Sequence, residues 1–309
     1  VGMVLLHELT EKELEDLIFV VVNLVNCCSS IEKRSTSNLI DIAKLNLRAA
    51  KKAKALSAFA SSAKYASMGI KLLPPDNSCA KSHYNLYLDL YSTGAESENY
   101  LGNTDQMKDY CDMALDLKGE GSSTVLDKLR VYKVLMDYMC HSGRPADALK
   151  LCLDVLGRLG CKFPCNSITQ SIAAVKSILR IKCDNNKMPT WSIEYISSMP
   201  IMSDEVMIEC VKLLDTATTH CFFTKNIKML LIILSRLLTL TISHGICDPS
   251  SATAFAVVGM ILIQLGDFKS ATLYAEAAVG TMNRLKDSSS NSSRTMFIVN
   301  SFILCWQNP

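Results

Sequence analysis

Glycine and proline are scarce in this chain, which holds 13 glycines and 8 prolines among its 309 residues. Few stretches alternate apolar and polar residues at a period of two, and this speaks against a protein built from β-sheets. The frequent residues are Ala, Leu, Lys, Ser and Met, which is a composition typical of helices. The sequence therefore predicts an all-α fold.

A strong charge of either sign is also missing, since 32 basic and 30 acidic residues leave a net charge of only +2. This balance argues against nucleic acid or an anionic membrane as the main partner. Hydrophobic residues make up 49% of the chain and charged residues 20%, so a large core can form and disorder is not expected.

Long apolar runs are absent as well, although the mean hydropathy is positive at +0.19. The most apolar stretch, 229–243, contains Arg236 and follows Lys228. It falls short of the roughly 20 apolar residues that a membrane span needs, so we expect no span. The chain starts without Met or a basic leader and ends directly after a helical pattern, and we expect it to be cut from a larger protein.

Cysteine, in contrast, is abundant, with 13 copies. Most of them lie inside apolar helical patterns, where a free cysteine behaves as a small buried hydrophobe. We therefore expect free thiols and a reducing, intracellular location in the cytoplasm.

Periodic apolar residues and the breakers between them predict about fourteen helices. They cover residues 11–25, 36–54, 57–73, 80–101, 104–118, 123–142, 145–157, 166–181, 190–197, 204–222, 225–244, 249–265, 267–284 and 292–306. Thr10 and Glu13 fit a capping box, Asp204 opens a later helix, and Pro249 suits a first helical position. We expect an irregular segment near 183–203.

Three junctions between predicted helices share one pattern, in which Gly102, Gly143 or Gly266 begins the turn. The residues five, eight and twelve positions after each glycine are small or apolar. They are Met107, Tyr110 and Ala114; Ala148, Leu151 and Val155; and Ala271, Tyr274 and Ala278. A glycine ends the first helix in a left-handed cap, and the three later positions share one buried face of the second helix. This pattern predicts stacked antiparallel helix pairs, an α-α superhelix forming one array over residues 1–309.

Several strings of the sequence carry a family resemblance. They are Ala43 to Lys54, Ser57 to Phe59, Gly69 to Pro74, Tyr87 to Tyr91, Tyr100 to Asn103, Leu126 to Tyr132, Leu156 to Gly160, Ser198 to Asp204, and Arg294 to Trp306. In this order they resemble the tetratricopeptide-like region of large signalling proteins that combine a serine/threonine kinase, an AAA-type ATPase and a sensor histidine kinase. In that family the region follows the ATPase module and precedes GAF and histidine-kinase modules. The resemblance implies an interaction scaffold, and ATP would bind only to the neighbouring modules.

Signatures of chemistry are weak in this chain. Gly157-Arg158-Leu159-Gly160 lacks the lysine and the preceding strand of a phosphate-binding loop, and Cys161 and Cys165 lack the second cysteine pair of a zinc site. The basic stretch from Lys44 to Lys54 has no interleaved aromatics for stacking bases. We expect a solvated face or a charge-matched patch for another module rather than a site for RNA or lipid.

The sequence thus predicts no enzyme and offers no catalytic, cofactor or metal residue; Gly102, Gly143 and Gly266 are structural residues. The expected function is a scaffold that binds protein modules of the same chain or peptide partners and couples an ATPase to a sensor kinase. Two alternatives stay open. The chain could be a free-standing adaptor, or a sensor domain that binds a small effector in an internal pocket.

Overall fold

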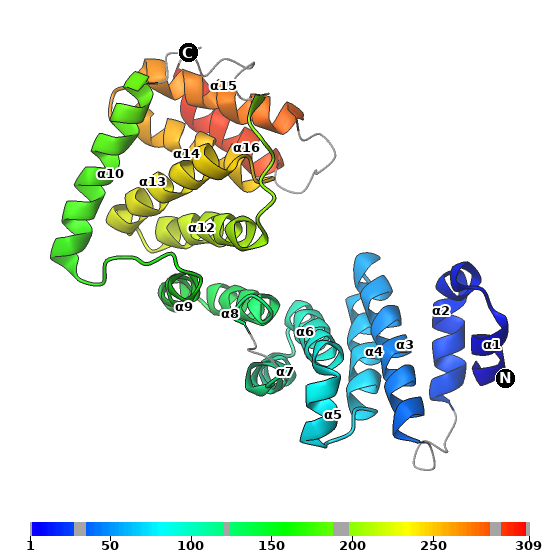
Figure 1. The fold of residues 1–309 in the computed structure, drawn as a ribbon. Helices are drawn as coiled ribbons and strands as arrows, with labels where there is room; N and C mark the ends of the chain where they lie inside the picture. The colour runs from blue at the N-terminus through cyan, green and yellow to red at the C-terminus, as the bar shows by residue number, and fades with distance from the viewer. Residues whose placement is uncertain (1, 28–34, 120–123, 188–197, 285–291, 307–309) are drawn as a thin grey trace. The chain divides into compact units, whose positions relative to one another are not determined.

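The computed structural model describes residues 2–27, 35–119, 124–187, 198–284 and 292–306, and these are helical nearly throughout (Figure 1). Within the described residues there is no strand, and one isolated parallel bridge joins Ile201 to Ile246. Contacts divide the chain into two compact units, Val1–Tyr138 and Met139–Pro309, here called unit 1 and unit 2. The all-α prediction is confirmed, while a single continuous array stays a prediction.

Unit 1 is built from consecutive helices that pack against their neighbours. They are α1 (Gly2–Glu8), α2 (Glu11–Asn26), α3 (Thr36–Ala55), α4 (Phe59–Lys71), α5 (Asn77–Ser82), α6 (Tyr84–Leu101), α7 (Thr104–Asp116) and α8 (Leu129–His141), whose last residues belong to unit 2. The predicted capping box at Thr10 is present, because the Thr10 hydroxyl accepts from the Glu13 amide and the Glu13 carboxylate accepts from the Thr10 amide.

Unit 2 surrounds one almost entirely buried helix. Its elements are α9 (Pro145–Arg158), α10 (Ser167–Lys187), α12 (Glu205–Phe223), α13 (Ile227–His244), α14 (Ser250–Gln264), α15 (Phe268–Arg284), α16 (Ser292–Ile298), the π-helix η2 (Val299–Ile303) and the 3₁₀-helix η3 (Leu304–Trp306). α14 packs against α12, α13, α15, α16 and η2, which explains why it is apolar all round. At its centre Phe255 is fully buried.

Most predicted helices are observed within a few residues, and five differ more; the helix predicted over 123–142, for example, begins only at Leu129. α1 precedes the first predicted helix, and the helix predicted over 80–101 is interrupted at His83, whose backbone leaves the helical region. α10 continues to Lys187, inside the segment predicted to be irregular. The helix predicted over 292–306 changes its hydrogen-bonding pattern twice, into η2 and η3. The helix predicted over 190–197 lies outside the described residues.

The three turn glycines all have left-handed backbones, with φ of 77° at Gly102, 72° at Gly143 and 78° at Gly266. Of the nine positions that follow them at the repeated spacing, eight are buried, and only Leu151 is partly exposed. The repeated sequence pattern therefore corresponds to a repeated helix–turn–helix geometry in both units.

Helix α13 is the one helix of the described residues that is long and apolar enough to cross a membrane. Half of its most apolar window is buried among other helices, and buried helices of globular cores meet the same criterion. The described part of the chain therefore contains no clear membrane span.

Candidate functional site

Cysteine chemistry does not concentrate at any one place. The eleven cysteines whose side chains the structure describes are free, and most are buried. Burial raises the pKa of Cys111, Cys152 and Cys221 to about 12 and that of Cys210 and Cys247 to about 11. Because the thiolate is the reactive form, these thiols stay protonated and act as packing groups.

The other suggested reactive groups are also scattered. Within the described ranges no three His, Cys, Asp or Glu side chains lie close enough together to hold a metal ion. Cys161 is buried and Cys165 is exposed. His220 of α12 does meet a thiol, with its Nδ1 3.2 Å from the Sγ of Cys140. Burial lowers the pKa of His220, so its ring is held neutral inside unit 2.

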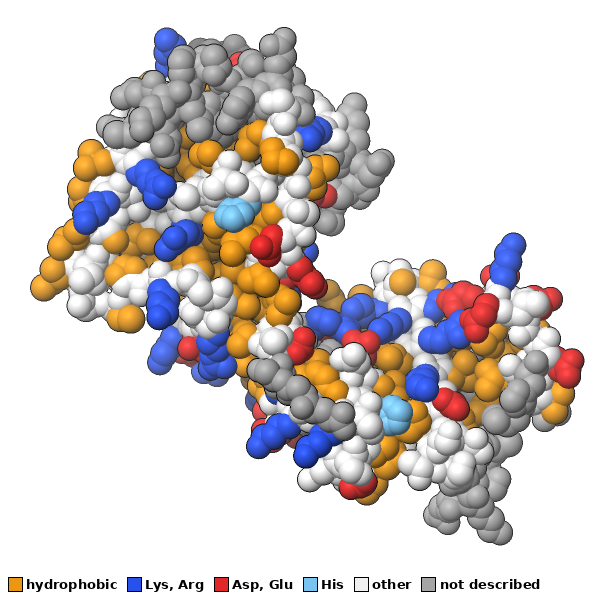
Figure 2. All heavy atoms as spheres, viewed as in Figure 1, with side chains coloured by type: hydrophobic (Ala, Val, Ile, Leu, Met, Phe, Trp, Pro, Cys, Tyr) orange, Lys and Arg blue, Asp and Glu red, His pale blue; other side chains and the backbone are white. Residues whose placement is uncertain are grey.

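The basic stretch of α3 is matched by groups of unit 1. Lys44 pairs with Asp41, Arg48 with Glu11 and Glu15, Lys51 with Asp89, and Lys54 with Glu96, at 2.5–3.2 Å, while Lys52 donates to the Glu15 carbonyl and lies over the Phe19 ring. Figure 2 shows acidic and basic side chains interleaved over these helices. These five cations are therefore engaged within the fold and do not form a free polycationic face.

Arg130 of α8 is the centre of this network. Its guanidinium donates to Glu96, Asp89 and Thr93 of α6 at 2.8–3.0 Å. Burial by itself would raise the pKa of Glu96, but the hydrogen bonds and charges of Arg130 and Lys54 lower it. Glu96 is thus held ionised between cations from two helices, which links α3, α6 and α8.

Unit 2 contains the feature that best fits a binding site, an open cavity of about 240 Å³ called here the aromatic pocket. Its lining comes from α12, α13, α14, α16 and η2: Thr218, Thr219, Phe222, Phe223, Leu230, Val257, Met260, Arg294, Phe297, Ile298 and Phe302. The base is formed by buried aliphatic side chains such as Leu230, Val257 and Ile298.

Four phenylalanines form the mouth of the aromatic pocket. Phe222 and Phe223, at the end of α12, are 62% and 64% exposed, and Phe297 and Phe302 are 60% and 37% exposed. The rings of Phe297 and Phe302 meet edge to face, with centroids 5.7 Å apart. Large aromatic side chains over an open apolar cavity are typical of surfaces that bind a partner or ligand.

One ion pair joins two of the helices that line the aromatic pocket. Arg294 of α16 donates to the buried Asp215 carboxylate of α12 at 3.2 Å and lies 3.5 Å from the Thr218 hydroxyl. Burial raises the pKa of Asp215, and this is partly offset by the charge of Arg294 and by a hydrogen bond with Ser250. The pair therefore fixes α16 against α12, and the pocket itself presents an apolar surface.

No protein-family model and no curated protein matches this chain.

The sequence alone does not predict the aromatic pocket. The Phe222–Phe223 pair at the end of a helix is the available signal, because one of two adjacent aromatics on a surface helix is often exposed. The partner residues Phe297 and Phe302 lie about 75 positions further along the chain. Only packing of α12, α16 and η2 against α14 brings them together.

Proposed function

We propose that this chain is a non-catalytic, tetratricopeptide-like scaffold that binds a segment of a protein partner, with the aromatic pocket as the anchoring site. The repeated glycine turns and the buried positions after them support the repeat interpretation. The eleven free thiols whose side chains the structure describes suit a reducing compartment, and we place the scaffold in the cytoplasm.

The single observation that carries this proposal is the open cavity with four exposed phenylalanines. Its volume is below the roughly 300–1,000 Å³ of pockets for drug-sized ligands. It suits one or two bulky apolar side chains, which are the usual anchors of peptide and protein partners.

The resemblance extends the proposal to signalling. In a longer protein, the scaffold would transmit the state of an upstream ATPase module to downstream sensor-kinase modules, because stacked helix pairs pass small displacements to their neighbours. Sequencing the coding region on both sides tests this part. A Walker A motif upstream and GAF or histidine-kinase motifs downstream are expected, whereas a reading frame confined to Val1–Pro309 would point to a free-standing adaptor.

The aromatic pocket can be tested with the dye 1-anilinonaphthalene-8-sulfonate, which fluoresces when its rings enter an apolar site. We expect saturable binding that is lost in the double variant Phe222→Ser/Phe297→Ser. Phe268→Ser is the matched control, since Phe268 is 48% exposed on α15 and does not line the pocket. Circular dichroism checks that each variant is folded. Equal dye binding by both variants would contradict the proposed site.

A second candidate, a sensor of a small effector, is favoured by the buried aliphatic side chains at the base of the same cavity. An apolar effector bound there would raise the melting temperature in proportion to its concentration. A screen of apolar metabolites for a thermal shift that Val257→Trp abolishes distinguishes the two functions, because Val257 lines the pocket and is buried. A saturable shift lost in that variant supports the effector function, and its absence leaves the protein partner as the better account.

A further inference from the structure

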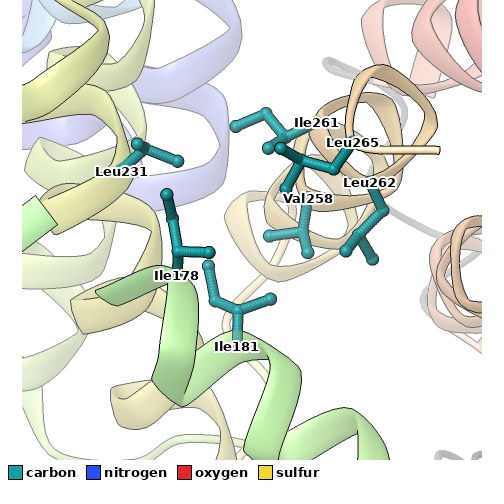
Figure 3. Close-up of a pocket in the computed structure, with 7 residues that line it drawn as sticks. All are labelled: Ile178, Ile181, Leu231, Val258, Ile261, Leu262 and Leu265. Atoms are coloured by element: carbon teal, nitrogen blue, oxygen red, sulfur yellow. The ribbon is translucent and has the colours of Figure 1, made fainter. Parts of the chain in front are cut away.

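The helix α10 has apolar side chains on two opposite faces. Asn166 caps its start by accepting from the Thr169 amide at 2.8 Å. The inner face includes Ala174 and Ile181, which are each 5% exposed, and the helix packs against α13. Figure 3 shows Ile178 and Ile181 directed toward Leu231 of α13, toward three side chains of α14 and toward Leu265, which follows α14. The cavity between them is only about 10 Å³, so this face is an internal contact with no room for a ligand.

The outer face carries a row of exposed aliphatic side chains, here called the α10 stripe. It consists of Ile168, Ile172, Val175 and Leu179, which are 73%, 52%, 58% and 56% exposed. They follow one another at spacings of four, three and four residues. This is the spacing of the a and d positions by which one helix packs along another. Figure 1 shows α10 along the margin of unit 2.

The charge beside the α10 stripe has one sign. From Ser167, the first residue of α10, to Cys183 the sequence contains three basic residues and no acidic residue. On the helical projection Lys176 and Arg180 lie together along one flank of the stripe, and both are exposed. Figure 2 shows basic and hydrophobic side chains along this margin. In the described parts of the chain neither cation has an ion-pair partner, in contrast to the cations of α3.

We propose that the α10 stripe docks an amphipathic helix of a partner whose apolar a and d residues are flanked by carboxylates. The a/d spacing specifies a helical partner, and the unpaired Lys176 and Arg180 specify the acidic flank. The stripe is narrow and has no aromatic side chain, whereas helices that lie in a bilayer surface have a broad apolar face, often with Trp or Phe. A second copy of α10 would bring like charges to the same flank, so self-pairing is disfavoured.

The test uses two fluorescent synthetic helices of the length of α10, with Leu at a and d. One carries Glu at e and g, and the other carries Lys there. Fluorescence anisotropy with the whole chain is expected to show binding of the Glu peptide and about tenfold or weaker binding of the Lys peptide. Ile172→Ser/Val175→Ser should weaken binding of the Glu peptide by about tenfold or more. Leu273→Ser, on the partly exposed Leu273 of α15, is the control and should leave binding unchanged.

The double reversal Lys176→Glu/Arg180→Glu gives a readout that a loss of folding cannot imitate, since it should invert the preference toward the Lys peptide. Failure of the Glu peptide to bind, or equal binding of both peptides, would overturn the proposal. The peptides could fail to bind while the chain binds phosphatidylcholine vesicles that contain phosphatidylglycerol, and Ile172→Ser/Val175→Ser could abolish that vesicle binding. This result would identify a membrane surface, and not a helix, as the partner of the α10 stripe. Self-association of the chain that is lost in the same variant would identify a second copy of the chain as the partner. Neither result bears on the aromatic pocket, which the dye measures separately.

Discussion

The α3 face of unit 1 and the α10 face of unit 2 differ in how their charges are paired. In unit 1 the cations of α3 and the guanidinium of Arg130 meet carboxylates of the same unit at 2.5–3.2 Å. In unit 2, Lys176 and Arg180 of α10 have no such partner among the described residues, and exposed aliphatic and aromatic rows lie on α10, α12 and α16. Charge that is paired internally contributes to the fold, while unpaired charge beside an apolar row is available to a partner. The difference supports a structural role for the charges of α3 and the proposed binding role for the α10 stripe.

The largest expected change in stability distinguishes a buried core phenylalanine of unit 2 from an exposed phenylalanine of the aromatic pocket. Phe255 is fully buried in α14, and Phe255→Ala should lower the free energy of unfolding by about 3–5 kcal/mol because it leaves a cavity. Phe297→Ala removes a ring that is 60% exposed, and should cost less than about 1 kcal/mol. Urea denaturation followed by circular dichroism measures both. Similar losses would mean that Phe297 serves the core and not the mouth of a pocket.

This contrast also shows what the sequence can and cannot specify. The apolar character of α14 on every side predicts both the helix and its burial, and the spacing after Gly102, Gly143 and Gly266 correctly predicts eight buried positions. Periodicity is local, however, and the aromatic pocket joins Phe222 to Phe297 through tertiary packing. The periodic pattern also does not register the change from α16 to η2, because the π-helical segment is only five residues long and too short to show a period of its own.

The next effect tests the paired charges of unit 1 against the unpaired charges of unit 2. Arg130→Met leaves the partly buried Glu96 with one cation fewer, and should lower the free energy of unfolding by about 1–3 kcal/mol. Lys176→Met on α10 is the matched control and should change it by less than about 0.5 kcal/mol. Equal effects of the two substitutions would contradict the distinction between the paired charges near α3 and the unpaired charges of α10.

The pH dependence of the Arg130→Met effect follows from the lowered pKa of Glu96. A carboxyl whose folded pKa lies below its unfolded value stabilises the fold above the unfolded value, and loses that contribution as the pH falls through the folded pKa. The difference between wild type and Arg130→Met should therefore be full at neutral pH and shrink below the ordinary value of 4.5. Urea midpoints measured across this range provide the check, and a difference that is constant with pH would argue against an ionised Glu96.

A smaller effect tests what the units have in common, their glycine turns. Gly102 of unit 1 and Gly266 of unit 2 both have positive φ, so either Gly→Ala change should cost about 1 kcal/mol. Gly157 provides the opposite control, because it lies inside α9 with open space where a Cβ would stand. Gly157→Ala should stabilise by about 0.5–1 kcal/mol. Thermal melts compare all three, and a neutral Gly102→Ala would contradict the left-handed turn.

The smallest effect concerns His220, which unit 2 buries in neutral form. Because burial lowers its folded pKa below the ordinary 6.5, the unfolded chain takes up the proton first as the pH falls. Stability should therefore decline below about pH 6.5, and His220→Gln should remove that part of the decline. His244→Gln, at an exposed position on α13, should retain it. Identical pH profiles of the two variants would show that His220 is not the responsible group.

The central claim is that unit 2 holds a protein partner at the aromatic pocket. The most direct measurement places the photo-crosslinker p-benzoylphenylalanine at Phe297 in the cells that express the protein, with Phe268 as the control position, and identifies the products by mass spectrometry. The account predicts one defined segment, of a partner or of the same longer polypeptide, linked from Phe297 and not from Phe268. Crosslinks that are absent at Phe297, or that are the same from both positions, would contradict it.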